Sequence, residues 1–214
     1  MPARSLFFLH VPFCAGDYVI SVALKHELRQ GPFLPQTPRY RGRPDGRLHY
    51  GGKNRVRRKA TDTDPSGTRC VQWAPGWDDG VRFAVVRNPF SVLLSMFHAS
   101  APPETPRDRR SFLSFLQRWA DDPQPDGGLF ASLFDEDGSC PLDQLLHAEH
   151  LDDGLQRLTA PLGIQPRRGP TPPQRDHRAW YTDPMRELVE RVCAPELAWT
   201  GYDFDGLRAE VAAA

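Results

Sequence analysis

An α/β fold built on a parallel sheet is predicted for this chain of 214 residues. Short apolar runs that suit buried strands alternate along the sequence with segments whose apolar residues recur at helical spacing. This alternation is typical of parallel strands that are connected through helices. The length suits one domain, residues 1–214, that is large enough to bury a hydrophobic core.

The first strand and helix are predicted near the start of the chain. The apolar run Ser5–Val11 indicates a buried strand, and a short turn with Gly16 follows it. Apolar residues at helical spacing then predict a helix over Tyr18–Arg29. The next stretch, Pro32–Gly67, is rich in Pro, Gly and Arg, so we expect an irregular insert of long loops with at most one short strand, over about residues 31–68.

The middle of the chain carries the clearest strand. After a weaker candidate strand at Cys70–Trp73, the run Val81–Val86 indicates a buried strand that the following Asn-Pro pair ends. A helix is expected from about Ser91. Another is expected over Ser111–Ala120, where large apolar side chains share one helical face.

The last third predicts one more strand and two helices. Gln144–His150 is strand-like, and Asp152 is placed to cap the helix behind it. Asp183, which a proline follows, is a suitable N-cap for the final helix, whose buried stripe includes Met185 and Val189.

Composition excludes several classes of protein. Apolar residues make up 39% and charged residues 25% of the chain, which is typical of a globular protein. The longest apolar stretches fall far short of the roughly 20 residues that a membrane span needs. The four cysteines are scattered without metal-ligand spacing, so we expect neither a metal site nor a disulfide framework. The start carries no secretory leader, so a cytoplasmic location is expected.

The zero net charge conceals two blocks of opposite sign. Nine Lys/Arg and one acid lie in the block Arg39–Lys59, whereas ten acids and no Lys or Arg lie in Asp121–Asp153. The basic block is either a solvated loop or a surface that binds an anion or a partner. No known nucleic-acid reader motif accompanies the block, so it is weak evidence for nucleic acid as its ligand.

Two segments are expected at the carboxyl ends of strands, where open parallel sheets bind ligands. The first, HVPFCAGDY, spans residues 10–18. It is either a loop whose backbone N–H groups attract an anion or an ordinary turn, and it lacks the Walker pattern. The second, VVRNPFSVLLSMF, spans residues 85–97, and in it Ser95 follows Arg87 by eight residues.

The second segment resembles the 3′-phosphate-binding segment of sulfotransferases that use 3′-phosphoadenosine 5′-phosphosulfate (PAPS). The resemblance implies that Arg87 and Ser95 hold the 3′-phosphate, for which a guanidinium and a hydroxyl are suitable donors. The alternative is that Arg87 only ties down the turn and Ser95 is a packing residue. Three more segments are similar to the family in the same order: FFLHVP at the start, residues 134–164 and residues 178–205.

Together these matches cover roughly half of the chain. They imply a fold like that of nucleotide kinases, with a central parallel sheet of about five strands flanked by helices. They also place Arg178 where it could reach the 3′-phosphate, although a solvated surface arginine is the alternative.

The 5′-phosphosulfate loop of the family reads roughly PKTGGTS, and here the corresponding cofactor-binding positions are Phe13, Cys14, Ala15 and Gly16. Phe13 stands in place of the family's lysine, whose charge neutralises the sulfonate during transfer and commonly supplies a few kcal/mol of catalysis. Lys25, on the next helix, is one candidate to supply the missing charge.

A hydroxyl acceptor also requires a general base. The candidates nearest the loop are Asp17 and His26, and Asp17 could instead be an N-cap for the first helix. His10 and His98 are more simply structural.

The expected activity is therefore transfer of a sulfuryl group from PAPS to a hydroxyl of a small molecule or sugar, with release of adenosine 3′,5′-bisphosphate. Two alternatives stay open: a catalytically degenerate subunit that partners an active sulfotransferase-like chain, and an anion- or nucleic-acid-binding module that uses the basic block. The opposite charge blocks and the altered loop favour a homodimer or a heterodimer with a related chain.

Overall fold

The computed structural model describes residues 6–24, 48–51, 80–121, 128–134, 138–169 and 176–209. Its contacts divide the chain into two compact units. The first unit comprises residues 1–86 and 132–172, and the second comprises residues 87–131 and 173–214.

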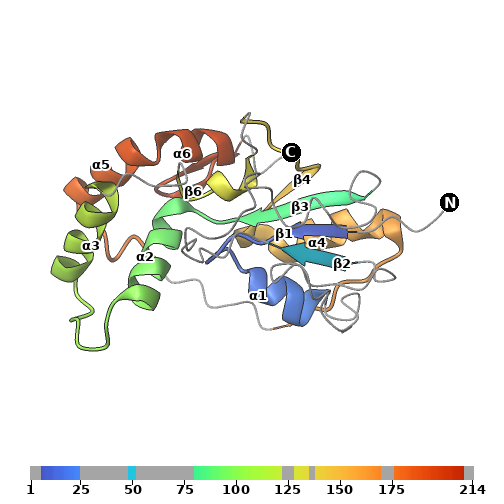
Figure 1. Cartoon of the computed structure of the whole chain (residues 1–214), viewed down its shortest axis with the longest axis horizontal. Helices are drawn as coiled ribbons and strands as arrows, with labels where there is room; N and C mark the ends of the chain where they lie inside the picture. The colour runs from blue at the N-terminus through green and yellow to red at the C-terminus, as the bar shows by residue number, and fades with distance from the viewer. Residues whose placement is uncertain are drawn as a thin grey trace, which may run out of the picture. The chain divides into compact units, whose positions relative to one another are not determined.

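A parallel sheet forms the centre of the first unit (Figure 1). Its strand order is β2-β1-β3-β4, and each neighbouring pair is parallel. The predicted α/β class is thus confirmed, with four parallel strands in the described part of the chain where about five were expected. The strands are β1 (Leu6–Leu9), β2 (Leu48–Gly51), β3 (Val81–Val86) and β4 (Gln144–His147).

The central strands are rich in apolar residues because both faces of the sheet are buried. Phe7 and Phe8 point to opposite faces, yet neither is exposed to solvent. In β3 the last four residues are all buried, which gives the continuous apolar run that made this strand predictable. The short strand expected within Pro32–Gly67 is β2, whereas Cys70–Trp73 lies outside the described residues.

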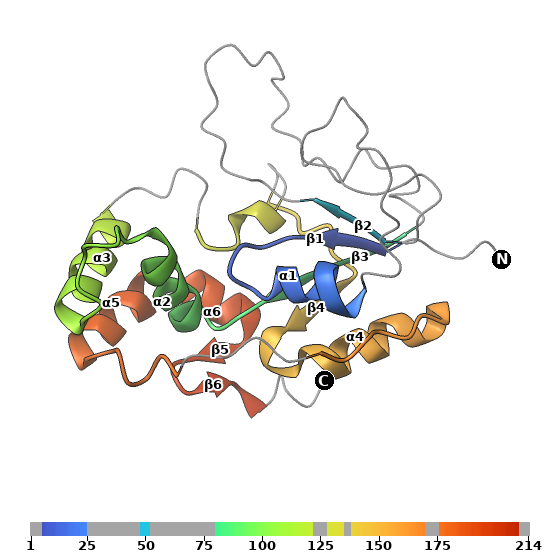
Figure 2. The same ribbon diagram turned by 90° about the horizontal axis from the view of Figure 1, so that it is seen from below.

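Two helical segments pack on the same face of this sheet. Their buried residues join one core cluster with Leu6, Phe8, Phe83 and Val85, and Figure 2 shows α1 and α4 next to the strands. The segments are α1 (Gly16–Tyr18), which continues as the π-helix η1 (Val19–Ala23), and α4 (Leu151–Thr159), which lies between the short 3₁₀ turns η4 (Ala148–His150) and η5 (Ala160–Leu162).

Three expectations for these elements need correction. The helix expected over Tyr18–Arg29 starts at Gly16 and becomes a π-helix, with residues 25–30 outside the described part. The strand expected up to His150 ends at His147. Asp152 does not cap α4, because its carboxylate accepts a hydrogen bond of 2.7 Å from the Tyr18 hydroxyl.

The second unit consists of helices and one small hairpin. Its helices pack around an aromatic core that includes Phe90, Phe112 and Tyr181. The elements are α2 (Pro89–Ser100), α3 (Arg109–Asp121), α5 (Asp183–Val192), α6 (Ala194–Thr200) and the antiparallel strands β5 (Tyr202–Asp203) and β6 (Gly206–Leu207); the 3₁₀ turn η3 (Ala131–Leu133) lies at the unit boundary.

The predicted helix positions in this unit are close to the observed ones. The helix expected from about Ser91 begins at Pro89, behind Asn88 as its N-cap. The helix expected behind Asp183 is α5, which has Thr182, rather than Asp183, as its N-cap, and α6 follows it as a separate helix that was not predicted. Among the helices that the structure describes, none combines the length and the apolar character that crossing a membrane requires.

Candidate functional site

Arg87 and Ser95 are in direct contact. Arg87 is the first residue after β3, and its Nη1 donates a hydrogen bond of 3.2 Å to the hydroxyl of Ser95 on α2. Its Nε is buried and has no hydrogen-bond partner among the described residues. A buried donor without a partner costs about 1–3 kcal/mol. The guanidinium therefore has a donor left for an oxygen of an anionic ligand.

Asn88 holds the turn between β3 and α2. The Asn88 side chain is 2% exposed. Its Oδ1 accepts a bond of 3.1 Å from the backbone N–H of Phe90, and its Nδ2 donates one of 2.8 Å to the carbonyl of Asp203. Asn88 supplies both of these bonds without Arg87, and the bond from Arg87 to Ser95 also spans the turn, so the structural alternative for Arg87 stays open.

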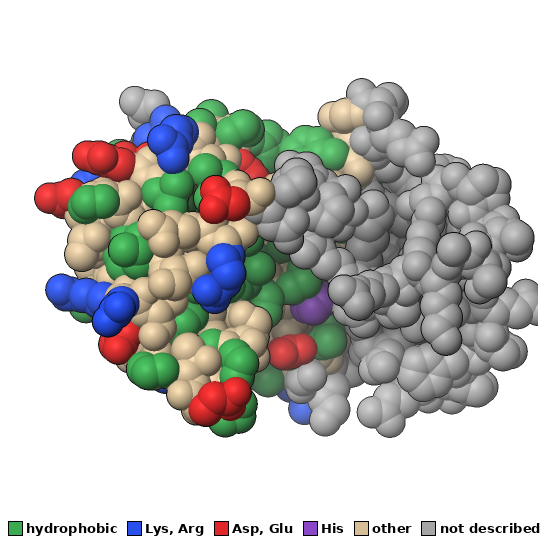
Figure 3. Space-filling model, turned by 60° about the vertical axis from the view of Figure 1, so that its left-hand side comes forward, with side chains coloured by type: hydrophobic (Ala, Val, Ile, Leu, Met, Phe, Trp, Pro, Cys, Tyr) green, Lys and Arg blue, Asp and Glu red, His purple; other side chains and the backbone are tan. Residues whose placement is uncertain are grey.

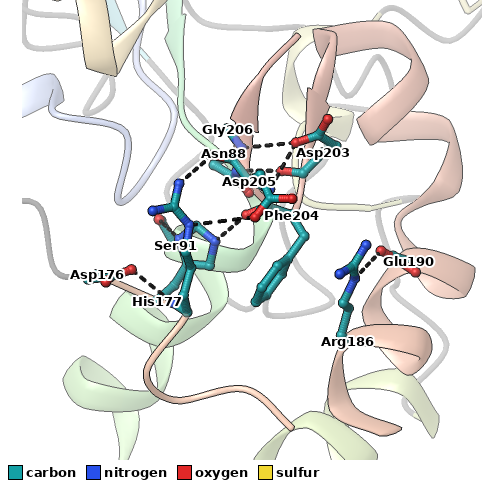
Figure 4. A network of polar contacts seen from close by, with 11 residues as sticks. Asn88, Ser91, Asp176, His177, Arg186, Glu190, Asp203, Phe204, Asp205 and Gly206 are labelled. Atoms are coloured by element: carbon teal, nitrogen blue, oxygen red, sulfur yellow. Dashed lines mark hydrogen bonds and ion pairs between the residues drawn. The ribbon is translucent and has the colours of Figure 1, made fainter. Parts of the chain in front are cut away.

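A second polar network anchors the segment before α5 (Figure 4). His177 Nε2 lies 2.8 Å from the carbonyl oxygen of Phe204, which can only accept, so Nε2 carries the hydrogen. Burial lowers the pKa of His177, which favours the neutral ring, and in that form the Ser91 hydroxyl donates to Nδ1 at 2.9 Å. Both side chains are 7% exposed.

This serine–histidine pair is a structural anchor. The imidazole also stacks on Phe90, with ring centroids 5.7 Å apart, so the pair fixes the segment around His177 to α2. Sequence reasoning missed it, because Ser91 and His177 lie 86 residues apart and neither belongs to a recognisable motif.

Arg178 is engaged with the turn of the hairpin. Its guanidinium donates a hydrogen bond to the backbone carbonyl of Asp205, and its Nε lies 3.8 Å from the carboxylate of the same residue. With 53% of its side chain exposed, Arg178 fits the alternative of a surface arginine. The next aromatic residues belong to the core of the unit, since the Tyr181 hydroxyl is bonded to the carbonyl of Phe90 and Trp180 packs on Phe112.

In the first unit, the strand-end loop between β1 and α1 has an unusual backbone. Phe13 and Ala15 adopt left-handed conformations, with φ angles of 65° and 60°. Residues with a Cβ rarely do so, and such outliers cluster at functional sites. Cys14 and Gly16 are buried, whereas Phe13 is 39% exposed.

The loop leaves backbone donors without partners. Among the described residues, Ala15, Gly16 and Asp17 donate no backbone hydrogen bond. The carbonyl of Ala15 accepts from Tyr18, which closes the turn. Residues 10–18 contain no Lys or Arg, so within the loop only backbone N–H groups and His10 could face an anion.

Of the three catalytic candidates that the sequence suggested, the structure describes one, Asp17. Asp17 is exposed and lies in the first turn of α1, whose N-cap is Ala15, so the N-cap reading of Asp17 is wrong. Lys25 and His26 lie outside the described residues. Sequence reasoning gave His10 a merely structural role.

The His10 ring lies directly against Gly16. A Cβ built on Gly16 would come within 1.9 Å of its Cδ2 and 2.2 Å of its Nε2. The ring also meets the Phe8 ring at 6.0 Å with an interplanar angle of 65°. Burial lowers the pKa of His10, and the charge of Asp17 opposes this effect.

Other surfaces of the described residues are weaker candidates for a ligand site. None of their His, Cys, Asp and Glu side chains gather in groups of three or more that could hold a metal ion. A groove of about 550 Å³ between α3 and α5 is lined by apolar side chains such as Leu113 and Leu188, and also by Asp121, Glu187 and Arg191. Figure 3 shows basic and acidic side chains interspersed with apolar ones on the described part of the face drawn there.

Comparisons of the chain with protein-family models, with curated proteins and with solved structures found no match.

Proposed function

We propose that the chain is a PAPS-dependent sulfotransferase that transfers a sulfuryl group to a hydroxyl of a small molecule or sugar. The observation that carries this proposal is the contact of Arg87 with Ser95 at the end of β3. The two residues that the sequence resemblance assigns to the 3′-phosphate are hydrogen-bonded to each other, and Arg87 Nε has no other partner in the described part of the chain.

The family resemblance assigns different residues to the 3′ and 5′ ends of the nucleotide. Arg87 and Ser95 would hold the 3′-phosphate through charge-assisted hydrogen bonds. By the resemblance, the loop from Phe13 to Gly16 would face the 5′-phosphosulfate, and the N–H groups of Ala15, Gly16 and Asp17, which have no backbone acceptor among the described residues, could donate hydrogen bonds to its oxygens.

PAPS supplies the sulfuryl group when bound and leaves as adenosine 3′,5′-bisphosphate. The bond from sulfur to the 5′-phosphate oxygen breaks as the acceptor oxygen bonds to sulfur, and the hydroxyl proton passes to a base. Asp17, exposed beside the loop, is the described candidate for that base, and His26 is the other.

A catalytically degenerate subunit is the second candidate, and Phe13 is the observation that favours it. The family's lysine is absent, and the exposed ring of Phe13 carries no charge to offset the sulfonate. Such a chain would bind the nucleotide without transferring sulfate by itself, and would act in a dimer with an active chain. Sulfate transfer by the isolated chain, with light scattering to report its assembly, separates the two candidates.

Nucleotide titration tests the proposal. Adenosine 3′,5′-bisphosphate should bind more tightly than AMP, which lacks the 3′-phosphate, and should raise the melting temperature by mass action. Arg87→Ala should weaken bisphosphate binding by about tenfold to a hundredfold, the effect of one or two lost charge-assisted bonds. It should leave AMP binding and the melting point without ligand nearly unchanged.

Arg118→Ala, which removes an exposed charge from α3, is the matched control and should bind like the wild type. Equal affinity of the wild type for bisphosphate and AMP would refute the proposal. So would an Arg87→Ala protein that unfolds without ligand, because Arg87 would then be structural. Binding that weakens steeply with salt, without preference for the bisphosphate, would favour the nucleic-acid-binding alternative.

A further inference from the structure

The backbone of the strand-end loop is strained at two positions. Each left-handed conformation, at Phe13 and at Ala15, is unfavourable for a residue with a side chain. The backbone hydrogen bonds within the described loop include a long one of 3.4 Å from Cys14 to the carbonyl of Val11, and those to the carbonyl of Ala15. A conformation of this kind persists only where the surroundings enforce it.

The His10 imidazole is placed to enforce it. It extends from the end of β1 to the backbone of Gly16, so close that no side chain larger than hydrogen fits there without displacing the ring. The edge contact with Phe8 supports the ring from the side of the strand. Gly16 has no left-handed φ, so its lack of a Cβ is explained by this contact and not by its backbone conformation.

We infer that His10 is a positioning residue, whose imidazole lies between β1 and Gly16 and holds the loop in the conformation that leaves the N–H groups of Ala15, Gly16 and Asp17 free for the 5′-phosphate end of the nucleotide. This role rests on the proposed function and adds to it a residue that acts only on one end of the ligand. His10 acts through the loop backbone, so its loss should affect ligands according to their 5′ group.

The test compares adenosine 3′,5′-bisphosphate with adenosine 3′-monophosphate, which lacks the 5′-phosphate. In His10→Ala, affinity for the bisphosphate should fall by about tenfold, because binding must then restore the strained loop. Affinity for the 3′-monophosphate should stay within about twofold. His10→Phe, which keeps a ring against Gly16, should retain most of the affinity for the bisphosphate.

A double-mutant cycle tests the contact itself. Gly16→Ala should destabilise the wild type, because its methyl group displaces the imidazole, and should be nearly neutral in the His10→Ala background, where that space is empty. Gly16→Ala also disturbs the loop from its own side, so it replaces His10→Ala in the titration if that variant does not fold.

The outcomes separate the two levels of the proposal. A wild type that prefers the bisphosphate, with a His10→Ala variant that weakens both nucleotides equally or neither, overturns the positioning role and leaves the proposed function standing. A wild type that binds both nucleotides equally also overturns it, because the loop then contributes nothing at the 5′ end. A wild type that binds neither overturns the proposed function and this role with it.

Discussion

Replacement of Ala15 by glycine should stabilise the protein slightly. Ala15 has φ 60° and ψ 19°, and the left-handed conformation costs a residue with a Cβ about 1–2 kcal/mol. Glycine avoids this cost, but its greater freedom in the unfolded chain costs about 0.5–1 kcal/mol. The half-buried methyl group of Ala15 also contributes some of the roughly 0.8 kcal/mol of a fully buried one.

Relief of the left-handed conformation should exceed the losses from chain entropy and methyl burial by a few tenths of a kcal/mol. For a chain of this length, such a gain in stability raises the melting temperature by about 1 °C. Ala160 is the matched control, because it is exposed, belongs to the same unit and has a right-handed backbone with φ −55° and ψ −45°. Ala160→Gly should destabilise by about 0.5–1 kcal/mol, so the two variants should differ by about 1 kcal/mol.

Urea denaturation of both variants measures this difference in the free energy of unfolding, provided that both variants have the same m-value, the slope of that free energy against urea concentration. For Ala15→Gly, the sign of the change in unfolding free energy is more informative than its size. If Ala15→Gly destabilises the protein as much as Ala160→Gly, then Ala15 is not in a left-handed conformation, and the account of a strained loop is wrong.

Two further predictions concern buried polar contacts. Tyr18→Phe removes a hydroxyl that donates to Asp152 and accepts from the N–H of Gly169. It should lower the free energy of unfolding by about 1–3 kcal/mol in urea denaturation. A loss below about 0.5 kcal/mol would mean that these bonds contribute little. Burial holds the pKa of His177 below its usual value of 6.5, so the folded state takes up this proton less readily than the unfolded state, and stability present above about pH 6.5 is lost as the pH falls below it. His177→Gln should therefore lose less stability than the wild type between about pH 7 and pH 5, and an equal loss in both proteins would contradict this assignment.

The sequence predicted those elements whose pattern is local. Val81–Val86 was found to the residue, because its last four residues are buried and form a continuous apolar run. The start of α2 was missed by two residues, although the Asn-Pro pair that caps it was recognised as a boundary. The Arg87–Ser95 contact likewise depends on neighbours within one strand-to-helix segment.

Long-range contacts were not predictable in the same way. Asp152 was expected to cap its own helix, but it binds Tyr18, 134 residues away in the sequence. The continuation of α1 as a π-helix is hidden in the sequence, because apolar residues at helical spacing do not distinguish α from π geometry. The left-handed backbone at Phe13 and Ala15 contradicts local preference, so only the surrounding structure could reveal it.

The interleaving of the two units has a consequence for how the protein can be dissected. Each unit is assembled from two separate stretches of chain, with crossings after Val86, Ala131 and Pro172. No single cleavage point can therefore release either unit intact, and a truncation at any crossing leaves at least one unit incomplete. The sheet shows this directly, because β4 pairs with β3 only after the intervening part of the second unit has been synthesised. A nascent chain on the ribosome that ends before Gln144 carries β3 as an open sheet edge, which is the form most exposed to mispairing with other chains.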